Sequence, residues 1–478
     1  MIIIEQLYEN SMNNPNKIAV IEGCNEITYS ELWSRIVTAS RFYKQLASKG
    51  ERVILAANKS VDFVYSYFGA QLAGLITVTV DTAVNMTRLR RIYESANPVA
   101  IFGNLDVNSS EFVVRSFPDI TSESDDFDGV FPEENDLADI LYTTGTTGFP
   151  KGVALSHYNE FCAASMINMF IGNNENDIEL LALPISHSFG LGRLRCTVLK
   201  GGTLDMLGSF ASMKKFYAEM DNRAITGFGM VPASWNYIKK MSGDKIKNYS
   251  DQLRYIEIGS APMKLEDKKL LMEYLPNTRI CMHYGLTEAS RSAFICFNED
   301  SDHLDSIGHP SPTVDIRIMD ENGELVGCNK AGEICVKGGH VCCQYWGNDS
   351  EKYSDSFYGD YFRTGDWGFV DDNGYYHLVS RYKELINVGG KKVSPIEVEE
   401  IIDSIKGIEE SACIGIPDDV MGEVVKAFVV RNDSTIKAED IIKIVSRRIE
   451  QYKVPVIVEF IDQIPKTSSG KIQRLQLK

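Results

Sequence analysis

At 478 residues the chain is too long for one ordinary hydrophobic core, so we expect two or more domains. Its composition, 44% hydrophobic and 24% charged residues, is that of a globular protein and excludes a disordered or fibrous chain. The formal net charge of −17 argues against a surface that neutralises the phosphates of a nucleic acid. A site for a single nucleotide is still compatible with this charge, because it needs only a few local donors.

Ten cysteines are spread along the chain, and no two of them stand at a C-x-x-C spacing, so we expect no zinc site. The first residues, Met1 to Glu5, lack a basic leader and a cleavage signal, and we find no apolar run long enough to span a bilayer. We therefore expect a cytoplasmic protein with reduced thiols, in which every cysteine is a small buried hydrophobic residue.

Residues 27–140 alternate amphipathic stretches, such as Tyr29 to Leu46, with short apolar runs at 52–56 and 99–102. The same rhythm continues from 178 to about 300, where we expect buried strands at 180–183 and 255–258. Alternation of this kind predicts layered α/β structure. We therefore expect parallel, doubly wound sheets forming two α/β subdomains.

Near residue 310 the pattern changes, because Val314, Ile316 and Ile318 alternate with polar residues and lead into an Asp-Glu-Asn-Gly turn at 320–323. A second turn of this type at 371–374 predicts a small antiparallel β unit over residues 310–380. We place the main boundary near Ser380, which divides the chain into an N-terminal domain, 1–380, and a C-terminal domain, 381–478.

The C-terminal domain is predicted to be a small α+β unit. Its first helix is well marked, because Ser394 can cap it, Pro395 suits the first helical position and Glu397 completes a capping box. Strands are expected at 412–416, 424–430 and 456–460, with a helix at 438–449.

The most informative segment, YTTGTTGFPKG at residues 142–152, lies between a predicted strand and a helical stretch after Ser156. Its glycines let backbone amides face an anion, its threonines add donors and Lys151 supplies a mobile charge, which together suit a polyphosphate. It is not a Walker A loop, because no glycine precedes Lys151 and no Ser or Thr follows. The Gly-Lys element at 465–471 also fails that pattern, and the G-x-G at Gly190 lacks the third glycine of a dinucleotide fold.

Several motifs in one order make nearly the whole chain resemble the adenylate-forming superfamily of acyl-CoA synthetases, peptide-synthetase adenylation domains and firefly luciferase. These motifs are the Thr/Gly loop, GSAP at 259–262, YGLTE at 284–288, YFRTGD at 361–366, RYKE at 381–384, the pair Gly389-Gly390 and the closing loop at Lys471. The fold expected from the resemblance is a large N-terminal domain, with two α/β subdomains and the β unit, followed by a small mobile C-terminal domain.

The resemblance implies a role for each motif in binding ATP and magnesium. The β- and γ-phosphates would be held by Thr143, Thr144, Gly145, Thr146, Thr147, Gly148 and Lys151. The adenine and the acyl group would be bordered by Gly259, Ser260 and Ala261, with Tyr284 stacked on the adenine. Thr287 would touch the α-phosphate, and Glu288 would hold Mg²⁺.

The remaining motifs are implied to act on the ribose, on the reacting atoms and on domain movement. Asp366 would accept hydrogen bonds from both ribose hydroxyls, with Arg381 assisting. Lys471 would bridge the substrate carboxylate and the α-phosphate as charge develops. The C-terminal domain would turn about Lys383 and bring Gly389 and Gly390 to the thiol tunnel, while His187 would line the reaction centre as an orienting residue.

The substrate would be a small carboxylic acid. No acidic residue occurs at 187–193, where the family's amino-acid adenylation domains place the aspartate that pairs the substrate ammonium, so a fatty, aryl or hydroxy acid fits better than an α-amino acid. Space for it is expected beside Gly190, Gly192, Gly227 and Gly229, between walls formed by Phe189, Phe228, Met230 and Trp235. Arg193 and Arg195 would either anchor a distal anionic group or form a solvated helix face.

The acyl acceptor implied by the resemblance is the thiol of coenzyme A, with the phosphopantetheine arm of an acyl carrier protein as the second possibility. The sequence does not separate the two. A hypothesis of another class is a noncatalytic nucleotide sensor that retains the fold, against which the intact Glu288, Asp366 and Lys471 count.

Overall fold

The computed structural model describes residues 1–106, 111–120, 127–144, 150–347, 350–466 and 472–477. Within them the chain separates into two compact units. Unit 1 contains residues 1–304, 308–315 and 336–362, and unit 2 contains residues 305–307, 316–335 and 363–478. The boundary that the sequence predicts near Ser380 lies inside unit 2 and stays a prediction.

The first sheet of unit 1 has seven strands among the described residues. Their spatial order is β18 (Gln344–Trp346), β8 (Pro150–Ser156), β7 (Leu137–Thr144), β4 (Ile76–Val80), β3 (Arg52–Ala56), β5 (Ala100–Phe102) and β6 (Val114–Arg115). The strands from β7 to β6 pair in parallel, whereas β8 and β18 are antiparallel. The helices connected with this sheet are α2 (Tyr29–Leu46), α3 (Val61–Leu72), α4 (Met86–Ala96) and α5 (His157–Ile171).

The second sheet of unit 1 has nine described strands. Their order is β15 (His309–Pro310), β14 (Ala293–Cys296), β13 (Arg279–Tyr284), β12 (Tyr255–Ile258), β11 (Gly227–Met230), β9 (Ile178–Leu181), β10 (Thr203–Met206), β1 (Ile18–Glu22) and β2 (Asn25–Thr28). The strands from β13 to β1 are parallel, and antiparallel strands close both edges. The expectation of parallel-centred α/β subdomains is therefore confirmed.

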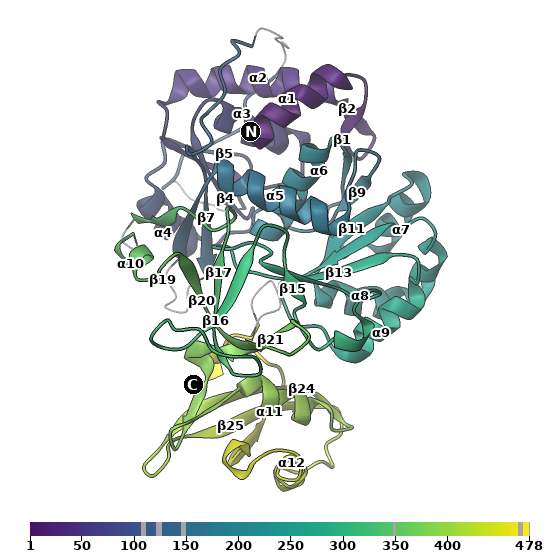
Figure 1. The fold of residues 1–478 in the computed structure, drawn as a ribbon. Helices are drawn as coiled ribbons and strands as arrows, with labels where there is room; N and C mark the ends of the chain where they lie inside the picture. Colours follow the sequence, from purple (N-terminus) through teal and green to yellow (C-terminus); the bar gives the residue numbers. More distant parts are fainter. Residues whose placement is uncertain (107–110, 121–126, 145–149, 348–349, 467–471, 478) are drawn as a thin grey trace. The chain divides into compact units, whose positions relative to one another are not determined.

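Helices cover the second sheet and complete its core. Figure 1 shows α7 (Met213–Asn222), α8 (Pro232–Ser242) and α9 (Leu265–Tyr274) together along one side of it. Their apolar side chains, such as Phe216, Trp235 and Leu271, form one buried cluster with Leu180 and Ile256 of the strands. The remaining described helices of unit 1 are α1 (Ile3–Asn13), α6 (Ser188–Lys200) and the short α10 (Glu351–Ser354). Trp235, Phe228 and Met230 are thus core residues.

The third sheet corresponds to the predicted antiparallel β unit. Its described strands are β16 (Asp315–Met319), β17 (Gly332–Lys337), β20 (Tyr361–Val370) and β19 (Phe357–Tyr358), with β21 (Tyr376–Arg381) paired to β20. The β20 strand pairs antiparallel with both β19 and β21. The expected turns at 320–323 and 371–374 are present, because Gly323 N donates to Asp320 O and Gly374 N donates to Asp371 O.

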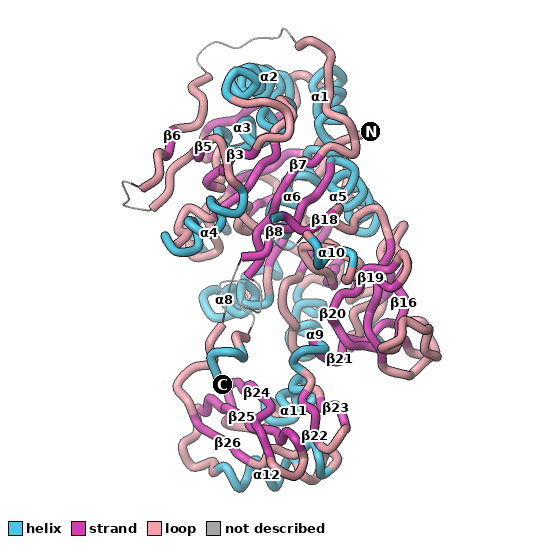
Figure 2. Tube along the Cα trace, turned by 90° about the vertical axis from the view of Figure 1, so that its left-hand side faces the viewer, coloured by secondary structure: helices cyan, strands magenta, loops and turns pink. Residues whose placement is uncertain are grey.

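The fourth sheet belongs to the C-terminal part of unit 2. Its strands are β23 (Lys391–Val393), β22 (Ile386–Val388), β25 (Gly422–Arg431), β24 (Ile408–Asp418) and β26 (Ile457–Phe460). Figure 2 shows β24, β25 and β26 near α11 (Pro395–Asp403) and α12 (Ala438–Val445). Side chains from these strands and both helices, including Val398, Val429 and Ile441, form a separate buried core.

Two local predictions in this part need correction. The helix predicted at 438–449 ends at Val445, because the next amides, of Arg447 and Arg448, donate to carbonyls three residues back and so form tighter turns. Ser394 does cap α11 by accepting from Glu397 N, but the Glu397 carboxylate accepts from Lys453 Nζ at 2.6 Å instead of completing a capping box.

A buried cluster of charged residues ties the elements of the nine-stranded sheet together. Arg193 of α6 donates to Glu179 of β9 and, at 3.1 Å, to Glu257 of β12. Glu257 also accepts from Arg291 Nε at 3.0 Å and lies 2.7 Å from His283 Nδ1. The side chains of Arg193 and Glu257 have no exposed area. We call these five residues the Glu257 cluster, and it fixes α6 against the carboxyl ends of β12 and β13.

Removing one cation from the Glu257 cluster should destabilise the fold. Arg193→Met leaves two buried carboxylates short of a partner, and we expect a loss of about 3–5 kcal/mol of stability. Arg90→Met is the matched control, because Arg90 pairs with Glu111 while its side chain is 47% exposed, and it should cost less than about 1 kcal/mol. Thermal unfolding of both purified variants checks this, and equal midpoints would contradict it.

Candidate active site

The antiparallel pair β7 and β8 presents the residues that flank the Thr/Gly loop. Thr143 and Thr144 end β7, and Thr143 pairs in register with Lys151 of β8. The loop residues between them, Gly145, Thr146, Thr147 and Gly148, lie outside the described residues, so their assignment stays a prediction. Lys151 Nζ lies 3.1 Å from the ring centroid of Tyr345 and 3.8 Å from Glu288 Oε1. The structure therefore brings Lys151 and Glu288 together, and adds Tyr345, which the sequence did not indicate.

The carboxyl ends of β12 and β13 carry the next two motifs side by side. These strands are parallel neighbours in which Ile258 pairs with Met282. Gly259 to Ala261 directly follow β12. Tyr284 is the last residue of β13 and is buried, with 8% of its surface exposed. Ser260 has a φ of 73°, which is uncommon for a residue other than glycine and is typical of strained functional loops. Thr287 and Glu288 follow β13 on the same edge of the sheet.

Glycine is required at position 259 because β12 and β13 approach each other closely there. A Cβ at this position would collide with the imidazole of His283, which stands one residue before Tyr284. His283 also belongs to the Glu257 cluster, so its ring cannot move aside freely. The backbone at the start of the GSAP motif is therefore fixed by the same buried charges that hold α6.

His187 directly precedes α6 and occupies its N-cap position without a side-chain capping bond. Desolvation by the surrounding protein lowers the pKa of His187, and Asp81 opposes this shift. The imidazole is therefore neutral near pH 7, which suits orientation of a substrate by a hydrogen bond more than charge pairing.

The solvated helix face expected for Arg193 and Arg195 is wrong, and the anchoring of a distal anionic group by one of them stays a prediction. Arg193 lies within the Glu257 cluster. Arg195 is also buried, and it pairs with Asp139, with Glu160 at 2.9 Å and with the Tyr67 hydroxyl at 2.7 Å. Neither guanidinium lies on a solvated helix face, and both already have internal carboxylate partners. A single helix pattern could not reveal partners that lie so far away in the sequence.

The predicted space beside four glycines is also occupied. A Cβ at Gly192 would lie 2.6 Å from Arg291 Nη1, and one at Gly229 would lie 2.8 Å from Leu183. Gly190 packs on the Pro184 carbonyl, and Gly227 packs on the ring of Tyr255. These glycines allow close packing of protein on protein, and the predicted walls Phe228, Met230 and Trp235 belong to the buried core, whereas Gly192 does line a pocket, described below.

Unit 2 holds the Asp366 and Arg381 pair. The two residues are opposite each other on β20 and β21, and Arg381 Nε lies 2.9 Å from Asp366 Oδ1. Arg381 Nη1 also donates to Thr364 O at 3.1 Å. Asp366 is buried, and Gly365 before it has a φ of 71°, a left-handed conformation that turns the carboxylate. The strand pairing thus preorganises a carboxylate that has further acceptor capacity.

The hinge candidate and the glycine pair are close in sequence within unit 2. Lys383 is exposed in the short 3₁₀ turn Tyr382–Glu384. Gly389 and Gly390, with φ of 58° and 80°, form the turn between β22 and β23, and Gly389 N donates to Met421 O at 2.8 Å. The remaining candidate, Lys471, lies outside the described residues.

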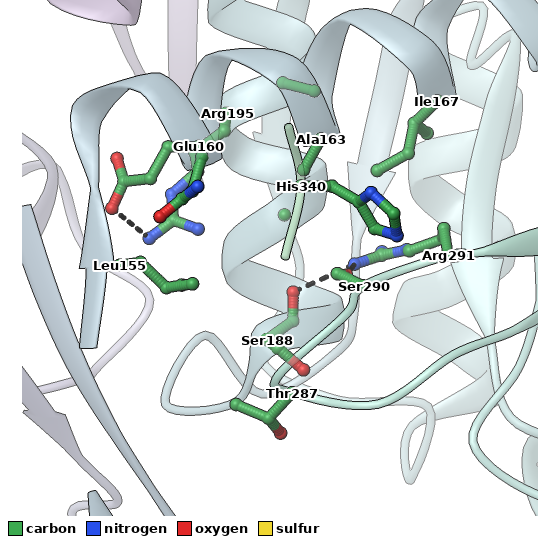
Figure 3. A pocket seen from close by; sticks show the side chains of 13 residues that line it. Leu155, Glu160, Ala163, Ile167, Ser188, Arg195, Thr287, Ser290, Arg291 and His340 are labelled. Atoms are coloured by element: carbon green, nitrogen blue, oxygen red, sulfur yellow. Dashed lines mark hydrogen bonds and ion pairs between the residues drawn. The ribbon is translucent and has the colours of Figure 1, made fainter. Parts of the chain in front are cut away.

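A pocket in unit 1 adjoins Thr287 and the start of α6. Figure 3 shows its walls, which come from α5, from α6, from the segment after β13 and from His340. The lining residues are Leu155, Asn159, Glu160, Ala163, Ala164, Ile167, Ser188, Gly192, Arg195, Thr287, Ser290, Arg291 and His340. His340 was not a candidate from the sequence, which contains no local motif that singles it out.

The cysteines and the helices answer two other expectations. None of the ten cysteines forms a disulfide, but Cys24, Cys328 and Cys343 are exposed and Cys162 is only partly buried, so the expectation that every cysteine is buried is wrong for these four. Throughout the part of the chain that the structure describes, no helix has both the length and the apolar character that crossing a membrane requires.

Comparison with known families identifies the class of this protein. The sequence model of the AMP-binding enzyme family matches residues 7–346, and the model of its C-terminal domain matches residues 397–471. The chain therefore belongs to the AMP-binding enzyme family, and the resemblance drawn from the motifs is confirmed. The curated relatives named below are acid–CoA ligases, and this chain is an enzyme of that acyl-CoA ligase family.

Individual relatives are distant but cover nearly the full chain. The long-chain-fatty-acid–CoA ligase FadD13 of Mycobacterium tuberculosis is 30% identical over 90% of this chain and 88% of its own length. The 2-succinylbenzoate–CoA ligase of Staphylococcus aureus is 28% identical over 98% of this chain and 99% of its own. The crystal structure of ATP-bound MatB from Rhodopseudomonas palustris superposes with a TM-score of 0.90 at 27% identity, covering 100% of this chain and 98% of that one.

Gly259→Ala should impair this site. The added methyl group meets the His283 ring, which the Glu257 cluster holds in place, and we expect at least about a 10-fold loss of ATP affinity or about 1–3 kcal/mol of stability. Gly208→Ala is the control, because no atom lies within 4 Å of its added Cβ. Calorimetric titration with ATP and thermal unfolding measure both effects. Two variants that behave alike would show that Gly259 has no steric role.

Proposed function

We propose that this enzyme activates a carboxylic acid with ATP, releases pyrophosphate to form an acyl-adenylate, and transfers the acyl group to the thiol of coenzyme A. The observation that carries the proposal is the meeting of Lys151, Thr287 and Glu288 at adjoining strand ends. A cation, a hydroxyl and a carboxylate there supply donors for phosphate and a ligand for a phosphate-bound metal.

The chemistry of Glu288 suits magnesium. Mg²⁺ is usually bound through one or two carboxylates together with substrate phosphates, and Glu288 offers one partly exposed carboxylate beside Lys151. Bound there, the metal would neutralise phosphate charge during displacement of pyrophosphate. Lys151 rests on the aromatic face of Tyr345, a weaker partner than a polyphosphate, so it is poised to contact the β- and γ-phosphates.

The other residues have roles that follow from their chemistry. Gly259, Ser260 and Ala261 border the adenine and the acyl group, with Tyr284 against the adenine. Asp366 binds the ribose hydroxyls and is oriented by Arg381. His187, neutral at pH 7, orients the acid beside the α-phosphate that Thr287 contacts.

Lys471 is proposed to offset the negative charge that develops as the acid displaces pyrophosphate. Lys471→Ala should therefore raise the barrier of adenylation by about 3–4 kcal/mol, a rate loss of roughly 10²–10³-fold. Pyrophosphate–ATP exchange measures this step alone. The control is Lys466→Ala in the same loop motif, whose ammonium pairs with Glu410 and which should retain exchange. Unchanged exchange in the Lys471 variant would remove the centre of this mechanism.

Lys383 is proposed as the hinge between the two half-reactions. A proline at 383 fixes φ near −65° and removes the amide donor, so it should hold the C-terminal domain in one orientation. We expect Lys383→Pro to retain one half-reaction and to lose at least about 10-fold in the other. Lys383→Ala, which keeps backbone freedom, is the control. The two steps are measured as pyrophosphate exchange and as thioester formation from isolated acyl-adenylate, and equal losses in both would exclude a hinge.

Coenzyme A is proposed as acceptor because the curated relatives are CoA ligases. The phosphopantetheine arm of a carrier protein presents the same thiol and is the second candidate. Parallel assays with coenzyme A and a phosphopantetheinylated carrier distinguish them by kcat/KM.

The experiment that tests the proposal as a whole is hydroxylamine trapping of the acyl-adenylate across fatty, aryl, hydroxy and amino acids. An acid-dependent hydroxamate supports it. ATP binding without hydroxamate or pyrophosphate exchange for any acid would favour the noncatalytic nucleotide sensor instead.

A further inference from the structure

The chain that directly follows Lys471 is held in place within unit 2. Ile472 forms an isolated β-bridge with Lys466, and Gln473 N donates to Pro465 O at 2.8 Å. The Ile472 side chain packs against a cluster of buried residues from β24 and β25. Residues 472–477, called the C-terminal segment below, therefore begin at a point that backbone contacts and apolar packing both fix.

Arg474 joins the C-terminal segment to two other elements of unit 2. Its Nη2 donates to Glu399 Oε2 of α11 at 3.0 Å, and its Nε lies 3.2 Å from Glu384 Oε2. Glu384 belongs to the 3₁₀ turn Tyr382–Glu384, which contains the hinge candidate Lys383. The side chains of Arg474 and Glu399 are only 11% and 9% exposed, so this pair is better shielded from water than a surface ion pair.

Glu399 is itself fixed on the side away from Arg474. Its Oε1 accepts from Cys413 N of β24 at 2.6 Å. Burial raises the pKa of Glu399 to about 7, a shift that Arg474 and the Cys413 amide oppose and that Asp403 increases. The carboxylate is therefore fully charged only above about pH 7, and its attraction for Arg474 is strongest there.

We infer that Arg474 is a positioning residue for the adenylation step, because it anchors the C-terminal segment next to Lys471 to α11 and to the hinge turn. This inference rests on the proposed function, in which Lys471 offsets the charge that develops as the acid displaces pyrophosphate. Arg474 acts through Lys471 and does not contact the substrate.

The short chain between the two residues is the physical reason for this role. Lys471 precedes Arg474 by three residues, and three residues span at most about 10 Å. Anchoring Arg474 to the hinge turn and to α11 therefore makes the backbone of Lys471 follow any rotation about Lys383. A catalytic group misplaced by about 1 Å can lose about 100-fold in rate, so loss of the anchor should slow adenylation.

Arg474→Met tests this inference through the two half-reactions. Pyrophosphate–ATP exchange is measured at pH 8, where Glu399 is charged, with whichever of octanoate, benzoate and lactate gives the highest exchange in the wild-type enzyme. We expect exchange to fall about 10- to 100-fold. Thioester formation from the isolated acyl-adenylate should stay within about 2-fold, because pyrophosphate is not displaced in that step. A merely structural role would lower both half-reactions together.

Arg448→Met is the matched control in the same part of unit 2. Arg448 is exposed and donates to Ser404 Oγ at 2.8 Å, so this variant should retain both half-reactions. Arg474→Lys keeps the charge but lacks the planar guanidinium that meets two carboxylates, and it should lose only about 3- to 10-fold in exchange. Thermal unfolding shows whether each variant is folded, and Arg474→Lys decides the question if Arg474→Met is not.

Wild-type exchange in both Arg474 variants, or equal losses in the two half-reactions, would overturn the inference. The variant Lys471→Ala separates this failure from that of the proposed function. If Lys471→Ala loses exchange while Arg474→Met retains it, only the anchoring role is refuted. If Lys471→Ala retains exchange, the role of Lys471 in adenylation is refuted, and the role of Arg474 with it.

Discussion

A buried carboxylate, Glu257, holds together the elements that carry the site in unit 1. Burial opposes its charged form, but Arg291, His283 and Arg193 outweigh this and keep the pKa of Glu257 below its usual range. Through these partners one side chain on β12 is connected to α6, to β13 and to the segment after YGLTE. Burying such a cluster costs desolvation energy. Its effect is to fix the relative positions of β12, β13, α6 and the segment after YGLTE, because the ion pairs form only in one arrangement of these four elements.

This constraint has consequences for the substrate. Beside the four glycines at 190, 192, 227 and 229, where the sequence had suggested space, the structure has close protein contacts, among them those of Arg291 with Gly192 and Tyr255 with Gly227. Thr287 lines a small pocket whose walls are both apolar and polar. The curated relatives include ligases named for acids as different as a long-chain fatty acid and 2-succinylbenzoate.

Unit 2 combines a ribose-binding candidate with a second set of charged contacts. Lys392 Nζ lies 4.4 Å from the ring centroid of Trp367, 4.3 Å from that of Tyr382 and 2.7 Å from Glu321 Oε1. Tyr382, next to the hinge candidate, also donates to Glu321 at 2.9 Å. These contacts join the antiparallel sheet to the β22–β23 hairpin around Lys383. Rotation about Lys383 would have to break them, so they define part of the energy that such a movement requires.

Local interactions are what the sequence by itself determined. The α2 helix begins and ends as predicted, because Thr28 and Glu31 form a capping box before an amphipathic stretch, and β12 matches its apolar run. The order of the motifs identified the family, and the adjacency of Asp366 and Arg381 followed from one hairpin. Only the tertiary structure decided the partners of Arg193 and Arg195, the packing of the glycines and the contact of Lys151 with Tyr345. Those properties depend on side chains far apart in the chain, and no local pattern records which distant residue will fill a given space.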